Sequence, residues 1–333
     1  MPRKAAEAMT HEERISSAST ARLWASPLMA LTLVFFSTTA GAMPFDDLFV
    51  FGDSNSDTGR RLALEGRPVS PPYYQGRHSN GPVAVEYVAS SLGLSLSPSS
   101  NNFAVGGALT GYGNVDTSHN NVLAATGMLD QFQTFKGLVG GTADRNALYF
   151  IWGAGNDITQ CGAASCTGTQ LRAIVSNLTT LVGDLYGLGA RHFMVVDDYG
   201  GNSAARTFDA MLLAAVQGLD SEGEDVRFFD ARSILVTMIA ANNPYGFTNT
   251  SSAAPCYTGT LNGTGGSVCD DPSPYVFWDP EGHLTARANG ILGNAMAASV
   301  VPEPDIALLL CTALIVLGWV VKRGGFVGKS RHR

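Results

Sequence analysis

Short, continuously apolar runs alternate along this chain with longer segments of helical period, and this alternation restricts the fold more than any other feature. Residues 47–51, 148–152 and 192–196 are the clearest apolar runs, and weaker ones lie at 226–229 and 102–105. Such runs are typical of strands that are covered on both faces, as in parallel sheets. We therefore expect these five segments to be buried strands.

The segments between these runs have the apolar spacing of helices. Apolar side chains fall on one stripe within residues 171–188, and residues 83–92, 204–219 and 233–241 repeat that spacing. Repeated strand, helix and strand units indicate one α/β domain, with a parallel sheet between two layers of helices. In sheets of this kind, ligands bind beyond the carboxyl ends of the strands.

An apolar run near the beginning of the chain is separate from this pattern. Residues 27–39 follow two arginines and precede Ala40-Gly41-Ala42. A positive flank, a short apolar core and a small-residue end are typical of a secretory signal peptide, here residues 1–42. A buried N-terminal helix is the alternative.

A second separate run, residues 306–321, follows Pro302-Glu303-Pro304 and precedes a basic end. The run is slightly shorter than the roughly 20 residues of a membrane span, and the basic end favours a cytoplasmic C-terminus. These features resemble the PEP-CTERM sorting signal of Gram-negative bacteria. The resemblance implies that residues 301–333 are recognised by an exosortase-type processing enzyme. An ordinary C-terminal membrane anchor is the alternative, and either one places the domain at residues 43–300 outside the cytoplasm.

The charge and the cysteines of the central part narrow the possible functions. Residues 43–303 contain 24 Asp and Glu against 12 Lys and Arg, a net charge of −12, so binding to nucleic acid or an anionic membrane surface by charge is not expected. Four of the five cysteines form two close pairs, Cys161/Cys166 and Cys256/Cys269. In an oxidising compartment they predict two disulfides, and nearest pairing is the simplest of three connectivities. A zinc site is a weaker alternative, because neither pair has Cys-x-x-Cys spacing.

Three short polar motifs follow strands of the predicted sheet. Ser54, in Gly52-Asp53-Ser54, becomes a good nucleophile only when a base removes its proton. The pair Gly106-Gly107 allows a backbone amide to approach a ligand closely. Asn156, in Gly155-Asn156-Asp157, can aim its amide N–H at a developing oxyanion. Each motif, taken alone, is also compatible with an ordinary turn.

The fourth motif supplies a base. Residues 277–285, before a final predicted helix, contain Asp279 and His283 as near neighbours. One turn can therefore bring both side chains to a single serine, with His283 as general base and Asp279 as the group that orients it.

In this order, the four motifs resemble those of the GDSL esterases and lipases of the SGNH hydrolase superfamily. The resemblance implies an α/β fold of three layers (α/β/α, flavodoxin-like) with a five-stranded parallel sheet. It also implies Ser54 as nucleophile, His283 as base supported by Asp279, and an oxyanion hole made by the N–H groups of Ser54 and Gly107 and by Asn156. Such chemistry requires no metal and no organic cofactor.

One further segment resembles a branch of that family. Residues 76–82 read Gly-Arg-His-Ser-Asn-Gly-Pro, and Glu86 follows. They are similar to the Gly-Arg-Phe-Ser-Asn-Gly-Pro segment of the lipase/phospholipase-like branch.

Two departures from the family pattern affect the site. Three residues separate Asp279 from His283, where the family has two. Gly282 could accommodate the extra residue, but Glu281 or a backbone carbonyl is then an alternative partner for His283. The second departure is Asp197-Asp198, which replaces a Pro-rich stretch after the central strand. These acids are expected near the substrate, where they would disfavour anionic lipid head groups.

The sequence as a whole predicts an exported serine ester hydrolase that acts through an acyl-serine intermediate. Lipid or phospholipid esters and acetylated polysaccharide are both candidate substrates. The alternatives are an acyltransferase that uses the same residues and a surface-anchored binding or matrix protein on a decayed hydrolase scaffold.

Overall fold

The computed structural model describes residues 45–117, 121–162, 165–221 and 225–301. The chain divides into two compact units, Met1–Ala42 and Met43–Arg333, and all described residues belong to the second. The expected signal peptide at residues 1–42 lies outside the described residues. So does nearly all of the expected sorting tail, including its apolar run. Among the described residues, no helix is long and apolar enough to span a membrane.

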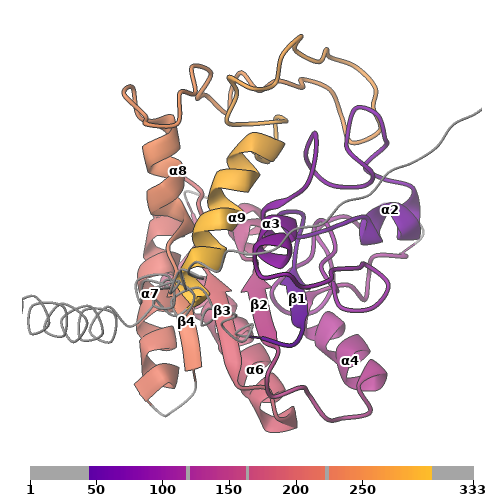
Figure 1. The fold of residues 1–333 in the computed structure, drawn as a ribbon, viewed down its shortest axis with the longest axis vertical. Helices are drawn as coiled ribbons and strands as arrows, with labels where there is room; N and C mark the ends of the chain where they lie inside the picture. Colours follow the sequence, from indigo (N-terminus) through magenta and orange to yellow (C-terminus); the bar gives the residue numbers. More distant parts are fainter. Residues whose placement is uncertain (1–44, 118–120, 163–164, 222–224, 302–333) are drawn as a thin grey trace, which may run out of the picture. The chain divides into compact units, whose positions relative to one another are not determined.

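Four parallel strands form the sheet, in the order in which they occur along the chain (Figure 1). They are β1 (Leu48–Gly52), β2 (Leu148–Trp152), β3 (His192–Val196) and β4 (Asp225–Phe229). The runs expected at 148–152 and 192–196 are confirmed with the same bounds, and the other two differ by one residue. All five residues of β1 and of β2 are buried, as expected for strands with helices on both sides.

The structure corrects the prediction of a fifth strand at 102–105, because the sheet has four strands. This segment lies beside β1 but forms only an isolated parallel bridge, between Asn102 and Val50. Its backbone does donate to β1, from Phe103 to Val50 at 2.8 Å. The carbonyl of Gly52 also accepts from Val105 N–H, at 3.2 Å, but the N–H of Gly52 donates to the side chain of Gln131, at 2.9 Å, so the ladder is incomplete.

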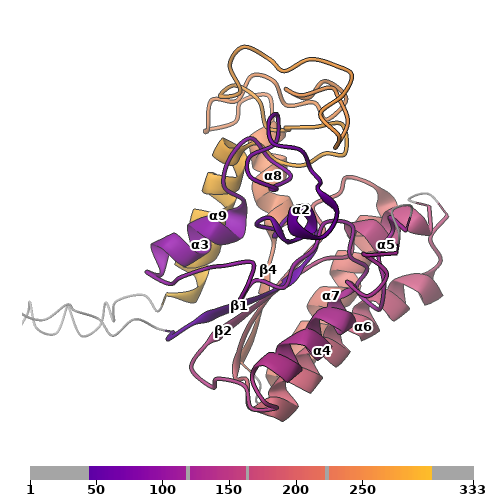
Figure 2. The same ribbon diagram turned by 90° about the vertical axis from the view of Figure 1, so that its right-hand side faces the viewer.

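Helices cover both faces of the sheet (Figure 2). On one face lie α3 (Ala84–Ser91), α8 (Ala231–Ile239) and α9 (Ala286–Val300). On the other face lie α4 (Met128–Leu138), α5 (Gly155–Gln160), α6 (Gly168–Leu188) and α7 (Ser203–Ser221). The three-layer α/β/α arrangement is therefore confirmed.

The two hydrophobic cores follow from the alternation of side chains along each strand. Phe49 and Phe51 of β1 pack with α4 and α6 on one face, while Leu48 and Val50 pack with α3 and α9 on the other. Both faces of the sheet are covered by apolar side chains. The polar side chains that could bind or react with a ligand therefore lie in the loops at the carboxyl ends of the strands.

Three helices were not predicted. They are α2 (Arg60–Glu65), α4 and α5. Both α2 and α5 have six residues, too short for a clear apolar period. In α4, Gln131 is buried although it is polar, so the apolar stripe is interrupted.

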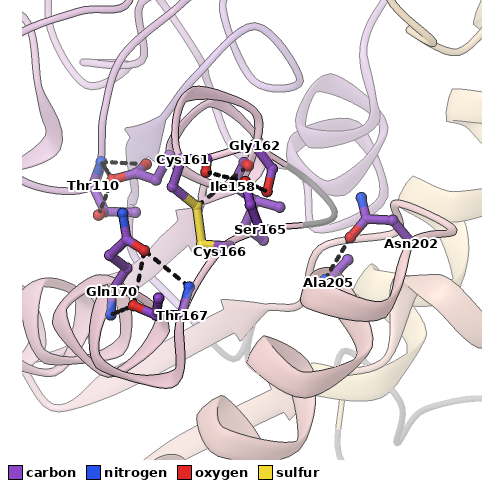
Figure 3. Close-up of a disulfide and its surroundings, with 11 residues drawn as sticks. Thr110, Ile158, Cys161, Gly162, Ser165, Cys166, Thr167, Gln170, Asn202 and Ala205 are labelled. Carbon is purple, nitrogen blue, oxygen red and sulfur yellow. Dashed lines mark hydrogen bonds between the residues drawn. A yellow bond between two sulfur atoms is a disulfide. The ribbon is translucent and has the colours of Figure 1, made fainter.

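Both disulfides form with nearest pairing, as predicted. Cys161–Cys166 joins the end of α5 to the segment before α6, where Thr167 accepts a hydrogen bond from the N–H of Gln170 (Figure 3). Cys256–Cys269 closes a loop within residues 242–274, a segment without regular helix or strand.

Candidate active site

Ser54, His283 and Asp279 form a continuous hydrogen-bonded chain. His283 Nε2 lies 2.7 Å from Ser54 Oγ. His283 Nδ1 lies 2.8 Å from Asp279 Oδ2 and 3.0 Å from Asp279 Oδ1. All three residues are buried. With Nδ1–H donating to the carboxylate, Nε2 is left as the acceptor for the serine proton.

The loop that carries Asp279 and His283 is a tight turn closed by backbone contacts. Phe277 and Leu284 form an antiparallel bridge, and the N–H of Trp278 donates to the carbonyl of His283. Gly282 has a φ of +88°, a conformation that residues with a Cβ rarely adopt. The extra residue between the acid and the histidine is accommodated at this glycine.

Asp279, and not Glu281, is the carboxylate nearest to His283. Glu281 Oε2 lies 4.0 Å from His283 Nδ1, and the Glu281 side chain is 58% exposed. Asp279 is fully buried, and it also accepts hydrogen bonds from the backbone N–H groups of Glu281 and His283.

Tyr73 is a member of this network that the sequence did not indicate. Its hydroxyl donates to Asp279 Oδ2 at 2.9 Å, from a position 206 residues earlier in the chain. The Tyr73 ring packs edge-on against Tyr257, and Tyr257 stacks on Trp278. The carboxylate is thus held by an aromatic cluster as well as by its own loop.

Burial and charge together set the protonation of the pair. Burial alone would lower the pKa of His283, but the charge of Asp279 and its hydrogen bond raise that pKa to about 9. Burial would raise the pKa of Asp279, whereas the charge and hydrogen bond of His283 lower it below its usual value. The electrostatics therefore favour an imidazolium next to a carboxylate, the state that forms when the serine loses its proton.

Two backbone N–H groups beside Ser54 are available to a ligand. No hydrogen bond within the described residues uses the N–H of Ser54 or of Gly107, and both residues line the same cavity. Gly107 has a φ of +84°, and an added Cβ would lie 2.4 Å from Asn114 Oδ1. Glycine is therefore required for this close approach, and the two N–H groups are suited to an oxyanion.

Asn156 lies in the same cavity wall, but its amide is already in use. Its Nδ2 donates to the carbonyl of Ala108 at 3.0 Å and, at 3.4 Å, to Asp53 Oδ2. The second contact is at the outer limit of a hydrogen bond. Asn156 can donate to an oxyanion by exchanging this long contact for a shorter one.

Asp57 connects the Ser54 loop to the Gly106–Gly107 turn, a role that the sequence did not reveal. One carboxylate oxygen accepts from the N–H groups of Gly59 and Arg60, at 2.8 and 2.7 Å. The other accepts from Gly106 N–H at 2.8 Å and from Arg61 N–H at 3.1 Å. This side chain fixes the start of α2 and the position of the Gly107 amide at the same time.

Three further aspartates of the sequence motifs, Asp157, Asp197 and Asp198, lie in different surroundings. Asp157 accepts from the N–H and hydroxyl of Thr110, so it holds the loop that contains Thr110. Asp197 is buried, accepts from Ala231 N–H at the start of α8 and does not line the cavity. Asp198 lines the cavity, so only one of the two acids expected near the substrate lies there.

The cavity has a volume of about 790 Å³ and extends from the Ser54–His283 pair to α8. Its wall is polar near the pair and apolar along α8, where Leu235, Val236 and Ile239 contribute. The cavity therefore has room for an extended ester, with an apolar surface on one side.

Within the described residues, one group of side chains could hold a metal ion. His78, Glu281 and His283 have ligand atoms within 4.8 Å of one another. Both nitrogens of His283 already face Ser54 and Asp279, so a metal here would compete with the transfer of the serine proton.

Similar proteins are known. A family model described as GDSL-like lipase/acylhydrolase matches residues 48–296. The GDSL esterase/lipase LIP-4 of Arabidopsis thaliana is 27% identical, with 77% of this chain and 87% of the relative covered. The phosphatidylcholine-sterol acyltransferase of Aeromonas hydrophila is 24% identical, with 83% and 85% covered. A solved family 3 carbohydrate esterase of Clostridium thermocellum matches with a TM-score of 0.35 and 13% identity, covering 77% of this chain and 98% of that chain.

The family match includes β1 with Ser54, the Gly107 turn, Asn156 and the loop of His283. It covers most of the chain. The chain therefore belongs to the GDSL-like lipase/acylhydrolase family, a family of acyl ester hydrolases.

Proposed function

We propose that the protein hydrolyses acyl esters through an acyl intermediate on Ser54, with His283 as general base and general acid. The observation that carries the proposal is the 2.7 Å contact between Ser54 Oγ and His283 Nε2. This contact lies beside two unused backbone N–H groups in one cavity. A nucleophile, a base and oxyanion donors around one space are what acyl transfer requires.

In the first half of the reaction, Ser54 Oγ attacks the ester carbonyl carbon and its proton passes to His283 Nε2. The negative carbonyl oxygen is stabilised by the N–H groups of Ser54 and Gly107, and by Asn156 once its amide leaves Asp53. The carbon–oxygen bond to the alcohol then breaks, and His283 gives its proton to the departing oxygen. Asp279 remains ionised throughout and orients His283.

In the second half, water replaces the alcohol. Its oxygen attacks the acyl-serine carbonyl while His283 Nε2 accepts one of its protons. The bond to Ser54 Oγ then breaks, and the same proton returns to that oxygen. The carboxylic acid is released and the free enzyme is regenerated, with no redox step and no co-substrate other than water.

Acyl transfer to an alcohol is the second candidate, because one relative carries the name phosphatidylcholine-sterol acyltransferase. The residues are the same, and an acceptor hydroxyl would take the place of water. The decayed-scaffold alternative rested only on the altered spacing between acid and base. Since Asp279 lies 2.8 Å from His283, that support is removed.

For the biological setting, we infer an exported protein. Two disulfides in the described residues suit an oxidising compartment. The signal peptide at residues 1–42, the sorting tail at 301–333 with its exosortase-type partner, and a C-terminal membrane anchor remain proposals from the sequence. The apolar wall along α8 favours an acyl chain of some length, as in lipid esters, while acetylated polysaccharide needs only a short acyl group.

Hydrolysis of p-nitrophenyl acetate, butyrate and palmitate by the purified protein and by Ser54→Ala tests this proposal. We expect turnover by the wild type and a loss of at least about 10³-fold in Ser54→Ala, because the nucleophile is gone. A fluorophosphonate probe should label the wild type only. If the folded wild type is as inactive as Ser54→Ala and remains unlabelled, the proposal is wrong. Product analysis with added glycerol separates hydrolysis from acyl transfer.

A further inference from the structure

A second set of hydrogen-bonded side chains lines the cavity, separate from the one that contains His283. The hydroxyl of Tyr199 donates to Asn55 Oδ1 at 2.7 Å. Asn55 Nδ2 in turn donates to Asp53 Oδ1 at 3.2 Å. The other carboxylate oxygen, Asp53 Oδ2, accepts from Asn156 Nδ2 at 3.4 Å. All four residues, which we call the Tyr199 network, line the cavity, and the network ends at the side-chain donor of the proposed oxyanion hole.

The Tyr199 network joins the carboxyl ends of three neighbouring strands. Asp53 and Asn55 follow β1, and Asn156 follows β2. Tyr199 follows β3 and comes 144 residues after Asn55. The three strands pair side by side in the sheet (Figure 1). The Tyr199 ring packs edge-on against Trp152 at the end of β2, with 5.8 Å between ring centres, so the sheet fixes the ring while its hydroxyl reaches the loop after β1.

Burial and charge determine which groups donate in this network. Burial, and then the charges of Asp53 and Asp198, raise the pKa of the Tyr199 hydroxyl well above its ordinary value, so this hydroxyl keeps its proton. Burial raises the pKa of Asp53 to about 7, although the hydrogen bond from the N–H of Asn55 lowers it. Near pH 9, where His283 becomes able to act as a base, Asp53 is therefore a carboxylate that accepts through both oxygens.

The two oxygens of Asp53 have unequal contacts, and this affects Asn156. Oδ1 accepts from the backbone N–H of Asn55 at 3.0 Å as well as from its side chain. Within the part of the chain that the structure describes, Oδ2 accepts only the long contact from Asn156. The donors on Oδ1 therefore hold the carboxylate so that Oδ2 stays close to the Asn156 amide without binding it tightly. One hydrogen of that amide is committed to the carbonyl of Ala108, at 3.0 Å, and the other can be given to an oxyanion.

We propose that Tyr199 is a positioning residue for Asn156, the side-chain donor of the oxyanion hole. Tyr199 acts through Asn55 and Asp53. The inference rests on the proposed ester hydrolysis and adds a residue to its machinery. Without the Tyr199 hydroxyl, Asn55 Oδ1 loses this donor, and the Asn55 amide can turn away from Asp53. The carboxylate is then able to rotate, and it competes with the oxyanion for the amide of Asn156.

A competing route leads from Tyr199 to the loop of His283. The Tyr199 hydroxyl oxygen also lies 3.5 Å from the carbonyl oxygen of Gly282, at the outer limit of a hydrogen bond. A loss of activity in Tyr199→Phe could therefore come from a displaced base rather than from Asn156. A double-mutant cycle separates the two routes, because residues that act through the same group have non-additive effects.

The cycle compares kcat for p-nitrophenyl butyrate in the wild type, Tyr199→Phe, Asn156→Ala and the double variant. We expect Asn156→Ala to lower kcat by about 100- to 1,000-fold, as for the loss of one oxyanion donor. Tyr199→Phe should lower kcat by about tenfold, the value of one hydrogen bond. KM should change little in either variant, because the lost interaction is made only in the transition state. In the Asn156→Ala background, adding Tyr199→Phe should change kcat by less than about twofold.

Tyr73→Phe is the matched control, because it removes a tyrosine hydroxyl that donates to Asp279. Its kcat loss should persist in the Asn156→Ala background, since Tyr73 acts through the base and not through Asn156. Tyr199→Phe should leave unchanged the pH at which kcat/KM rises, because His283 keeps its own partners.

Asn55→Ala interrupts the Tyr199 network at its middle and answers the same question if Tyr199→Phe does not fold. Its kcat loss should likewise shrink to less than about twofold in the Asn156→Ala background. All variants are first compared with the wild type by thermal unfolding.

Three results would overturn this inference and leave acyl-serine hydrolysis intact. The first is a folded Tyr199→Phe with the kcat of the wild type. The second is a folded Asn156→Ala with that same kcat. The third is a loss in Tyr199→Phe that keeps its full size in the Asn156→Ala background. A folded wild type that hydrolyses no p-nitrophenyl ester overturns the proposed function, and this inference with it.

Discussion

In the proposed mechanism, the pair of Asp279 and His283 sets the pH at which Ser54 can be activated. Because the carboxylate raises the pKa of His283 to about 9, the base is protonated at lower pH and cannot accept the serine proton. We therefore expect kcat/KM for p-nitrophenyl butyrate to rise with pH until about pH 9. In Asp279→Asn, the rise should move down towards the ordinary histidine pKa of 6.5, and the plateau should fall by about 10³- to 10⁴-fold.

A second carboxylate provides the control for this pH profile. Glu281→Gln also removes a negative charge, but that charge is exposed and 4.0 Å from His283 Nδ1, so solvent screens it. The rise in kcat/KM should move much less than in Asp279→Asn. An unshifted profile in Asp279→Asn would show that this carboxylate does not control the base.

Side chains within the motifs could be predicted from the sequence, and those that support them could not. Ser54 and His283 lie in short motifs whose chemistry is recognisable, and they meet at 2.7 Å. Tyr73 supports Asp279 from 206 residues away, and only the folding of the chain brings them together. The choice between Asp279 and Glu281 also depended on the path of one turn, which the sequence leaves open.

The junction between β1, α2 and the Gly106–Gly107 turn depends on Asp57. In Asp57→Asn, one carboxylate oxygen is replaced by an NH₂ group, which cannot accept a hydrogen bond. Depending on how the amide is oriented, either the N–H groups of Gly59 and Arg60 or those of Gly106 and Arg61 lose their acceptor. Each unpaired buried donor costs about 1–3 kcal/mol, so the free energy of unfolding should fall by about 2–4 kcal/mol in urea titrations. Displacement of the Gly107 amide should also lower kcat by about 10-fold or more.

An aspartate at another helix start is the matched control for Asp57. Asp230 accepts from the N–H of Ser233 at the start of α8, at an exposed position. Asparagine is also a good N-cap residue, so Asp230→Asn should change both stability and kcat little. Equal kcat losses in the two variants would contradict a specific role of Asp57 in the oxyanion hole.

The elements with a strong apolar pattern were easier to predict than those without one. The strands β2 and β3 have strong apolar patterns and begin and end as predicted. The helix α6 ends as predicted but begins at Gly168, three residues before the predicted start at residue 171. The segment at residues 102–105 has an apolar pattern too, but Gln131 of α4 takes the N–H of Gly52 that would extend the ladder. A side chain from another helix thus occupies one of the hydrogen-bonding positions between β1 and this segment.

Across the domain, the segment 242–274 connects a disulfide to Asp279, the partner of His283. Cys256–Cys269 closes this segment, and the neighbouring Tyr257 packs against Tyr73. Tyr73 in turn donates to Asp279. The disulfide, the aromatic side chains and Asp279 therefore form one connected set of contacts.

Removal of this cross-link should therefore lower activity as well as stability. Cys256→Ser/Cys269→Ser opens a loop with a sequence separation of 13, and the free energy of unfolding should fall by about 3 kcal/mol. Because Tyr257 loses its support against Tyr73, kcat for p-nitrophenyl butyrate should fall at temperatures where the variant is still folded. Cys161→Ser/Cys166→Ser opens a loop with a separation of 5, should lower stability by about 2 kcal/mol, and lies away from this aromatic cluster. Its kcat should be closer to that of the wild type, and equal kcat losses in both variants would mean that the aromatic cluster does not transmit the effect.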